Sequence, residues 1–209
     1  DGHEYYMLKE IFEEPDAIEA ALRQDEGLLR ELALEILRGK QVVIIACGTS
    51  RHAALIGRYL FSNLAGKFCE VVMGSEFEYF ANSIDKNTVV IAISQSGETA
   101  DVIAGVKMAR TQGARIISMV NVPGSTLTRM SDRVIYLNCG PELCVAATKS
   151  FIAQLALFYL LTFAMLNQLE QGRQQLRGIT NQLRENLNAN GEKVRNLGKE
   201  ISDKPDFYF

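Results

Sequence analysis

Two short segments contain the small hydroxyl side chains that proteins use to bind phosphate. Residues 47–50 are Cys-Gly-Thr-Ser and residues 94–99 are Ser-Gln-Ser-Gly-Glu-Thr, and each follows directly on a run of apolar residues. Hydroxyl groups donate hydrogen bonds without adding charge, and the unpaired N–H groups at the start of a helix attract anions. Glycine has no Cβ, so it lets the backbone approach a ligand. The candidate binding residues in these segments are Cys47, Gly48, Thr49, Ser50, Ser94, Gln95, Ser96, Gly97 and Thr99.

The pattern of apolar runs predicts the fold that positions both segments. Short β-branched runs alternate with helical patterns, which is typical of a parallel sheet covered by helices on both faces. The expected strands are 41–46, 68–72, 88–93, 114–118 and 133–137, and the expected helices between them are about 51–65, 76–81, 99–112 and 126–130. We therefore predict a doubly wound α/β domain with five parallel strands in the flavodoxin-like order 2-1-3-4-5.

In that strand order, the first and third strands flank the point where the winding of the sheet reverses. Ligands bind beyond the carboxyl ends of the strands at such a point, so both hydroxyl segments would face one pocket. Ser, Thr and Gly are also ordinary residues of turns and helix caps, which is the alternative explanation for either segment alone. The motifs G-x-x-x-x-G-K-[ST] and G-x-G-x-x-G are absent from the sequence, which argues against nucleoside triphosphates and dinucleotides as ligands.

A third segment, residues 138–149, leads from the fifth expected strand into an apolar stretch. Gly140 and Pro141 indicate a turn, and Thr148 could cap the helix that follows. The segment begins beyond the end of a strand, so it could also line the same pocket. Capping and ligand contact can coexist, and the residue types favour neither over the other.

Helical patterns without strands flank the expected sheet. Residues 4–12 and 16–38 are predicted helices, with Pro15 at a first-turn position where its missing N–H costs nothing. The apolar stretch 151–166 is too short for a membrane span, so we expect a buried core helix or a subunit contact. The predicted organisation is a helical N-terminal extension (1–40), the α/β domain (41–170), a helical linker (171–204) and the opening strand of a truncated second domain (205–209).

The composition argues against several other functions. The formal net charge is −3, whereas a non-specific nucleic-acid binder needs a surplus of Lys and Arg. No metal site and no cofactor are expected, because the cysteines lack C-x-x-C spacing and the only histidines are His3 and His52. Reduced thiols and the lack of a secretory pattern indicate a cytoplasmic protein that does not bind a membrane.

With these segments in place, the chain resembles a known family. It is similar to the isomerase region of the glutamine:fructose-6-phosphate aminotransferases, also called glucosamine-6-phosphate synthases, in the first of their two sugar isomerase (SIS) domains. The similarity runs from about residue 4 to residue 166. The blocks that carry it, in matching order and spacing, are Lys9-Glu10-Ile11, Cys47-Gly48-Thr49-Ser50, Ser75-Glu76-Phe77, the segment from Ser94 to Asp101, Gly140-Pro141-Glu142 and Val145-Ala146-Ala147-Thr148-Lys149.

The resemblance implies roles for individual residues. Ser50, Ser94, Gln95, Ser96 and Thr99 would bind the phosphate of a hexose 6-phosphate, and Cys47, Thr49 and Val145 would lie against the sugar. The last block adds Ala147 and Lys149 to the candidate binding residues. Two positions depart from the family. Ala147 stands where the family usually has Ser, which removes a hydroxyl expected at the sugar, and Glu14 stands where it has Gln.

The resemblance also implies what the parent protein does. It would convert fructose 6-phosphate to glucosamine 6-phosphate with ammonia from glutamine, and its partners would be a glutaminase domain, a second SIS domain and a second copy of the chain. No catalytic residue is expected in this fragment, where only Glu98, Glu142 and Lys149 are titratable candidates near the pocket. The alternatives are a tandem-SIS deaminase or deglycase acting on amino-sugar phosphates, which Ala147 keeps open, and a non-catalytic sugar-phosphate sensor.

Overall fold

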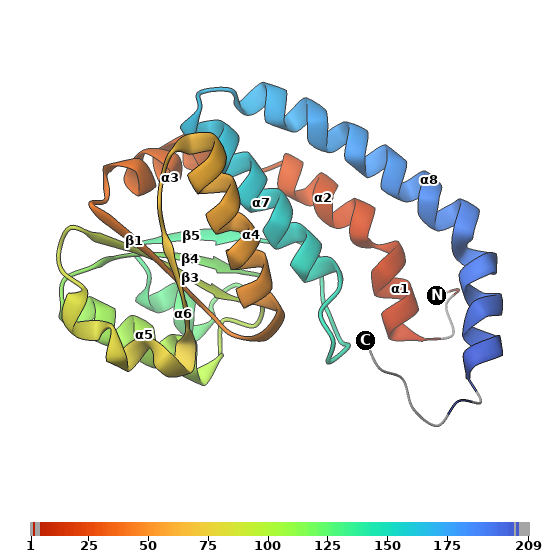
Figure 1. The fold of residues 1–209 in the computed structure, drawn as a ribbon, viewed down its shortest axis with the longest axis horizontal. Helices are drawn as coiled ribbons and strands as arrows, with labels where there is room; N and C mark the ends of the chain where they lie inside the picture. The colour runs from red at the N-terminus through yellow and green to blue at the C-terminus, as the bar shows by residue number, and fades with distance from the viewer. Residues whose placement is uncertain (1, 3–4, 203, 205–209) are drawn as a thin grey trace.

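A computed structural model describes residue 2, residues 5–202 and residue 204 (Figure 1). The predicted opening strand of a second domain, 205–209, lies outside the described residues. The first predicted helix, 4–12, is found as α1 (Tyr6–Phe12).

Five parallel strands form the central sheet. They are β1 (Gln41–Ala46), β2 (Glu70–Met73), β3 (Thr88–Ser94), β4 (Arg115–Val120) and β5 (Arg133–Tyr136). The order is β2-β1-β3-β4-β5, and the register pairs Val43 of β1 with Glu70 of β2 and with Val90 of β3. The middle strand, β3, is buried along its whole length, as expected for a strand covered on both faces. The predicted α/β fold and strand order are confirmed.

Helices cover both faces of this sheet (Figure 1). Val43 and Ile45 face a core that includes Phe77, Val102 and Val106, and the elements on that side are α5 (Ala100–Thr111), α6 (Thr126–Met130) and two short 3-10 helices, η1 (Gly74–Tyr79) and η2 (Ala81–Ser83). The opposite face packs against α3 (Glu26–Arg38), α4 (Gly48–Ala65) and α7 (Lys149–Met165). The alternation of side chains along each strand therefore supplies two separate cores.

The N-terminal region departs from the prediction of one helix over 16–38. The structure has two helices there, α2 (Glu14–Leu22) and α3. The break is stabilised by Asp25, whose side chain accepts a hydrogen bond of 2.7 Å from the backbone N of Leu28 and so caps a new helix. Gln24 in the break donates from Nε2 to the backbone O of Tyr136. Pro15 lies in the first turn of α2, as predicted.

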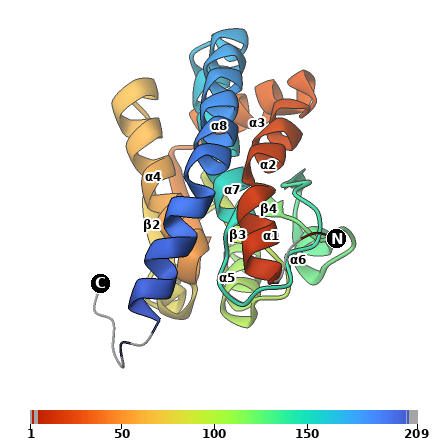
Figure 2. The same ribbon diagram turned by 90° about the vertical axis from the view of Figure 1, so that its right-hand side faces the viewer.

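The apolar stretch forms the buried helix α7, which confirms the core-helix interpretation. Among the described residues, no helix is both long and apolar enough to cross a membrane. The C-terminal residues form one continuous helix, α8 (Leu169–Ile201), which packs against α2 and α7 (Figures 1 and 2). Its first half buries Leu176 and Thr180, whereas Val194 and Leu197 in its second half are exposed.

The close approach of α4 to α7 requires a glycine. A Cβ added to Gly57 of α4 would overlap the ring of Phe158 of α7, which is itself fully buried.

We predict that Gly57→Ala lowers the free energy of unfolding by about 1–3 kcal/mol, because overpacking displaces the ring. Denaturant unfolding measures this change. The control is Gly178→Ala on the exposed surface of α8, where a Cβ meets nothing, and this variant should be neutral or slightly stabilising. Equal stability of both variants would contradict the prediction.

Candidate functional site

The first predicted binding segment forms the junction of β1 with α4. Cys47 is the N-cap residue in an extended conformation, and Gly48 begins α4 with a φ of 53°, which favours glycine. The Cys47 side chain makes no capping bond to this helix, so among the described residues the first-turn N–H groups remain available for an anion. The Cys47 sulfur lies against Gly74, 2.8 Å from where a Cβ on that glycine would stand. The thiol is therefore packed beside the end of β2.

The second segment is held in place by its own hydroxyl groups. Ser94 Oγ and Thr99 Oγ1 are 2.7 Å apart, and Ser94 Oγ also accepts a hydrogen bond of 3.0 Å from the backbone N of Gly97. Ser96 Oγ accepts from the backbone N of Glu98 at 3.1 Å. Thr99 is the N-cap of α5 but makes no side-chain capping bond to it. This loop thus presents preorganised hydroxyls beside a second uncapped helix N-terminus.

The third segment, between β5 and α7, is capped differently from the prediction. Thr148 is the N-cap residue of α7 but makes no side-chain capping bond. Instead, Glu142 Oε1 accepts from the backbone N of Thr148 at 3.0 Å and of Ser150 at 3.1 Å, and Oε2 accepts from the Ser150 hydroxyl. A carboxylate at this position satisfies the free donors of the first turn and complements the helix dipole. The N-terminus of α7 is therefore already occupied by a negative group.

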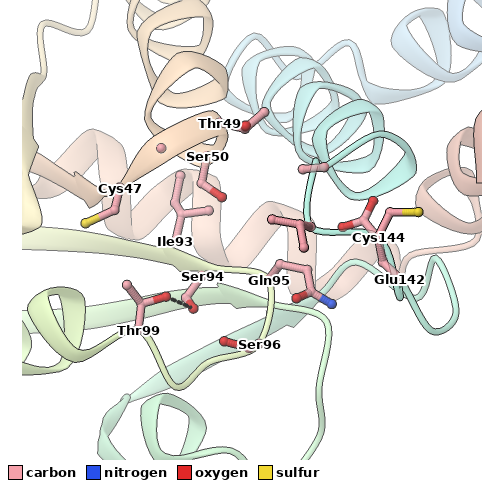
Figure 3. A pocket seen from close by; sticks show the side chains of 13 residues that line it. Cys47, Thr49, Ser50, Ile93, Ser94, Gln95, Ser96, Thr99, Glu142 and Cys144 are labelled. Atoms are coloured by element: carbon pink, nitrogen blue, oxygen red, sulfur yellow. Dashed lines mark hydrogen bonds between the residues drawn. The ribbon is translucent and has the colours of Figure 1, made fainter. Parts of the chain in front are cut away.

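The three segments enclose one cavity of about 310 Å³, a volume typical of small-ligand sites. Figure 3 shows Ser50 facing Ser94 and Gln95 across the hollow, with Glu142 and Cys144 on the third side. The cavity is lined by Cys47, Gly48, Thr49, Ser50, Ile93, Ser94, Gln95, Ser96, Thr99, Glu142, Cys144, Val145 and Ala147.

Two predicted binding residues lie outside this lining. Lys149 is buried, and its Nζ forms an ion pair of 2.5 Å with Glu13 Oε2. Gly97 has a φ of 68°, and a Cβ there would overlap the side chain of Ser125. Its φ and its packing beside Ser125 both require glycine at this position. Both positions therefore remain predicted binding residues that the cavity lining does not include.

Other residues at the site were not predicted to bind. Ile93, Glu142 and Cys144 line the cavity. Gln154 of α7 is buried, and its Nε2 donates a hydrogen bond of 3.0 Å to Ser50 Oγ. Because Ser50 accepts this bond, its own hydroxyl hydrogen remains free to donate into the cavity. A single Gln in an apolar helix could have indicated a polar contact at this position, because a buried amide needs a hydrogen-bond partner.

The charges around the cavity favour an anion at one side. Among the residues that the structure describes, Glu142 is the only charged side chain in the lining, and it lies on the α7 side. Attraction for an anion must therefore come from the N-termini of α4 and α5 and from neutral donors. The Glu98 carboxylate is engaged by another part of the chain. It accepts a hydrogen bond of 2.7 Å from the backbone N of Thr126, and this bond lowers the pKa of Glu98.

A metal site does not accompany these groups. Within the residues that the structure describes, no three His, Cys, Asp or Glu side chains are grouped as a metal ion would require. The polar side chains that line the cavity include hydroxyls and one amide, which can donate hydrogen bonds, and one carboxylate, which accepts them, a set suited to hydrogen-bonding a phosphorylated, hydroxyl-rich molecule.

Comparison with known proteins gives a family match and relatives that are longer than this chain. A family model described as SIS domain matches residues 35–164. The isomerizing glutamine-fructose-6-phosphate aminotransferase of Thermococcus kodakarensis is 40% identical over 217 aligned residues, which cover 100% of this chain and 36% of that protein. The corresponding protein of Aeropyrum pernix is 43% identical over 166 residues, covering 78% of this chain and 27% of its own length. The chain thus spans about a third of these relatives.

A solved structure agrees with these sequence matches. The C-terminal domain of glucosamine-fructose-6-phosphate aminotransferase from Francisella tularensis superposes with a TM-score of 0.80 at 30% identity. The match covers 98% of this chain and 61% of that one. The five-stranded fold and its flanking helices are therefore shared along nearly the whole chain.

The environment of Cys144 disfavours the thiolate form of its side chain. Burial, followed by a hydrogen bond to Glu10 and the negative charges of Glu10 and Glu142, raises the pKa of the Cys144 thiol. The thiolate is the nucleophile, so at a given pH fewer molecules are reactive. We predict that alkylation of Cys144 by iodoacetamide, followed by mass spectrometry, has its pH midpoint above that of the same cysteine in the protein unfolded in guanidinium. A midpoint at or below the unfolded value would contradict this prediction.

Proposed function

Because the chain belongs to the SIS domain family, we propose that its cavity binds a hexose 6-phosphate. The observation that carries this proposal is the convergence of two hydroxyl-rich loops and two uncapped helix N-termini on one cavity. Phosphate would lie against Ser94, Ser96, Thr99 and Ser50, because these donors surround the electropositive side. The sugar would extend toward Val145 and Ala147, with Thr49 and Cys47 beside it.

The parent protein, on this proposal, is an isomerizing glutamine-fructose-6-phosphate aminotransferase. Relatives with that name align with the whole chain while extending well beyond it. The parent would convert fructose 6-phosphate to glucosamine 6-phosphate with ammonia from glutamine, in partnership with a glutaminase domain and a second SIS domain. The four cysteines are unpaired, which supports a cytoplasmic location.

The described residues support binding without turnover. Proton transfer between adjacent sugar carbons needs a positioned base. The three titratable candidates are each engaged elsewhere, Glu98 with the N-terminus of α6, Glu142 with that of α7 and Lys149 with Glu13. We therefore assign no catalytic residue to this chain and expect the chemistry to depend on the rest of the parent protein.

One observation favours a second candidate function. Ala147 lines the cavity on its sugar side and offers no side-chain donor, so a differently substituted sugar would lose nothing there. A tandem-SIS enzyme that deaminates or deglycates amino-sugar phosphates is the alternative that this position supports. Titration of glucosamine 6-phosphate alongside fructose 6-phosphate compares the two directly, since the alternative requires tighter binding of the amino sugar.

The phosphate contacts can be tested by removing two hydroxyls. We predict that the double variant Ser96→Ala/Thr99→Ala weakens fructose 6-phosphate binding at least about tenfold, because each hydrogen bond to a charged group contributes about 1.5–3 kcal/mol. Isothermal titration calorimetry measures the dissociation constant, and thermal unfolding checks that the fold is retained. The matched control is Ser83→Ala/Thr111→Ala, which removes two exposed hydroxyls away from the cavity. An unchanged constant in the first variant would exclude these residues from the site, and lack of binding by the unmodified chain would refute the proposed function.

A homodimer is also part of the proposal. Ile179, Val194 and Leu197 of α8 are each about half exposed, at 46%, 63% and 55%, and apolar surface of this kind is commonly covered by symmetric pairing. We predict that the chain self-associates and forms no glucose 6-phosphate from fructose 6-phosphate. Light scattering that gives a monomer would contradict the first statement. Appearance of glucose 6-phosphate in a coupled assay would contradict the second.

A further inference from the structure

One wall of the cavity is a segment without helix or strand, residues 137–148. Side chains from other parts of the chain fix its backbone. The backbone N of Cys139 donates to Asn121 Oδ1 at 3.2 Å, and Asn121 Nδ2 donates to the backbone O of Gly140 at 2.7 Å. Further along, the backbone N of Leu143 donates to Glu10 Oε1 at 2.6 Å, and that of Cys144 donates to the same oxygen at 3.3 Å. The part of the wall nearest the sugar side therefore depends on Glu10.

Glu10 comes from α1, outside the sheet and its crossover helices. Its side chain is buried, with 2% of the residue exposed. Burying a carboxylate is costly unless hydrogen bonds compensate it. Oε1 receives both backbone bonds from the cavity wall, and Oε2 is buried with no hydrogen-bond partner among the described residues. The bonds to this wall are thus the compensation that the structure provides for a buried carboxylate.

A second contact joins the same helical region to the end of the wall. Glu13, the residue between α1 and α2, forms the ion pair of 2.5 Å with Lys149, the first residue of α7. The Lys149 side chain is only 4% exposed. The wall is therefore attached to the α1 region at Leu143 and Cys144 and again at Lys149, on both sides of Val145 and Ala147.

The opposite side of the cavity is fixed by other groups. The hydroxyls of Ser94 and Ser96 are held by bonds within their own loop, and Ser50 is held by Gln154. The proposed phosphate side and the proposed sugar side of the cavity thus have separate supports. A change in α1 should alter one side while leaving the other in place.

We propose that Glu10 is a positioning residue that sets the conformation of the cavity wall from Leu143 to Ala147 and thereby the fit of the sugar. It touches the wall and not the ligand, and it links the position of α1 to the sugar side of the cavity. This inference rests on the proposed function for the identity of the ligand, while its structural part concerns the wall alone.

The test compares two ligands in the unmodified chain, Glu10→Ala and Glu10→Gln. Calorimetry with fructose 6-phosphate should show about tenfold weaker binding for Glu10→Ala, because two backbone donors lose their acceptor. Binding of inorganic phosphate should stay within about twofold, since its donors are held independently. Glu10→Gln keeps one carbonyl oxygen as acceptor and should lose less affinity for the sugar phosphate. Glu19→Ala, which removes an exposed carboxylate that pairs with Arg184 on α8, is the control for a change in stability alone.

Alkylation of Cys144 gives a readout that needs no ligand. Glu10→Gln removes a charge that raises the pKa of the Cys144 thiol, so labelling at neutral pH should become faster while the buried Cys69 stays unreactive. Equal weakening of both ligands in Glu10→Ala, or no change for either, would overturn the inference. Failure of the unmodified chain to bind fructose 6-phosphate would refute the proposed function instead. An unchanged labelling rate of Cys144 in Glu10→Ala, which removes the acceptor that holds the backbone N of Cys144, would then overturn the inference on its own.

Discussion

A single carboxylate determines where the central buried helix begins. Glu142 accepts hydrogen bonds from the backbone of Thr148 and Ser150, and these satisfy donors that a helix leaves unpaired in its first turn. The helix that starts there, α7, packs against α2, α3, α4 and α8. The helical elements before and after the α/β domain therefore share one packing partner. The positions of these elements relative to the sheet therefore depend on where α7 begins, and Glu142 caps that end of the helix.

The same carboxylate gives the cavity its polarity. The N-cap residues of α4 and α5, Cys47 and Thr99, make no side-chain capping bonds, so these helix ends present partial positive charge, whereas the α7 side carries Glu142. A phosphate group would be attracted to the first side and repelled from the second. A ligand with phosphate at one end and hydroxyls at the other is thereby given one preferred orientation. No Lys or Arg of the described part of the chain lines the cavity, so the field of backbone dipoles and the neutral donors must supply that attraction.

The sequence predicted the bounds of elements whose signals come from neighbouring residues. The strand 41–46 and the helix 126–130 lie at their predicted bounds, because apolar runs and flanking turn residues are local signals. The meeting of both hydroxyl segments followed from topology alone. The break before α3 could not be derived in this way. Asp25 is a recognisable cap, but Gln24 is buried through a bond to Tyr136, 112 residues away, and no local pattern reveals that partner. Thr148 was an available cap by residue type, yet Glu142, six residues earlier in the chain, makes the capping bonds.

The two polar residues near the start of α7 show how much a sequence can say about such contacts. Lys149 and Gln154 interrupt an apolar stretch, and because the helix is buried, each must have a partner. That much follows from the sequence. The identity of the partners does not, and it decides what the residues do: Lys149 pairs with Glu13 beside α1, whereas Gln154 orients the hydroxyl of Ser50 at the cavity. Both residues lie on α7, so the helix that pairs with the α1 region also carries the side chain that orients Ser50. Glu10 holds the backbone of the cavity wall at Leu143 and Cys144, whereas the hydroxyls on the opposite side are held by their own loop and by Gln154.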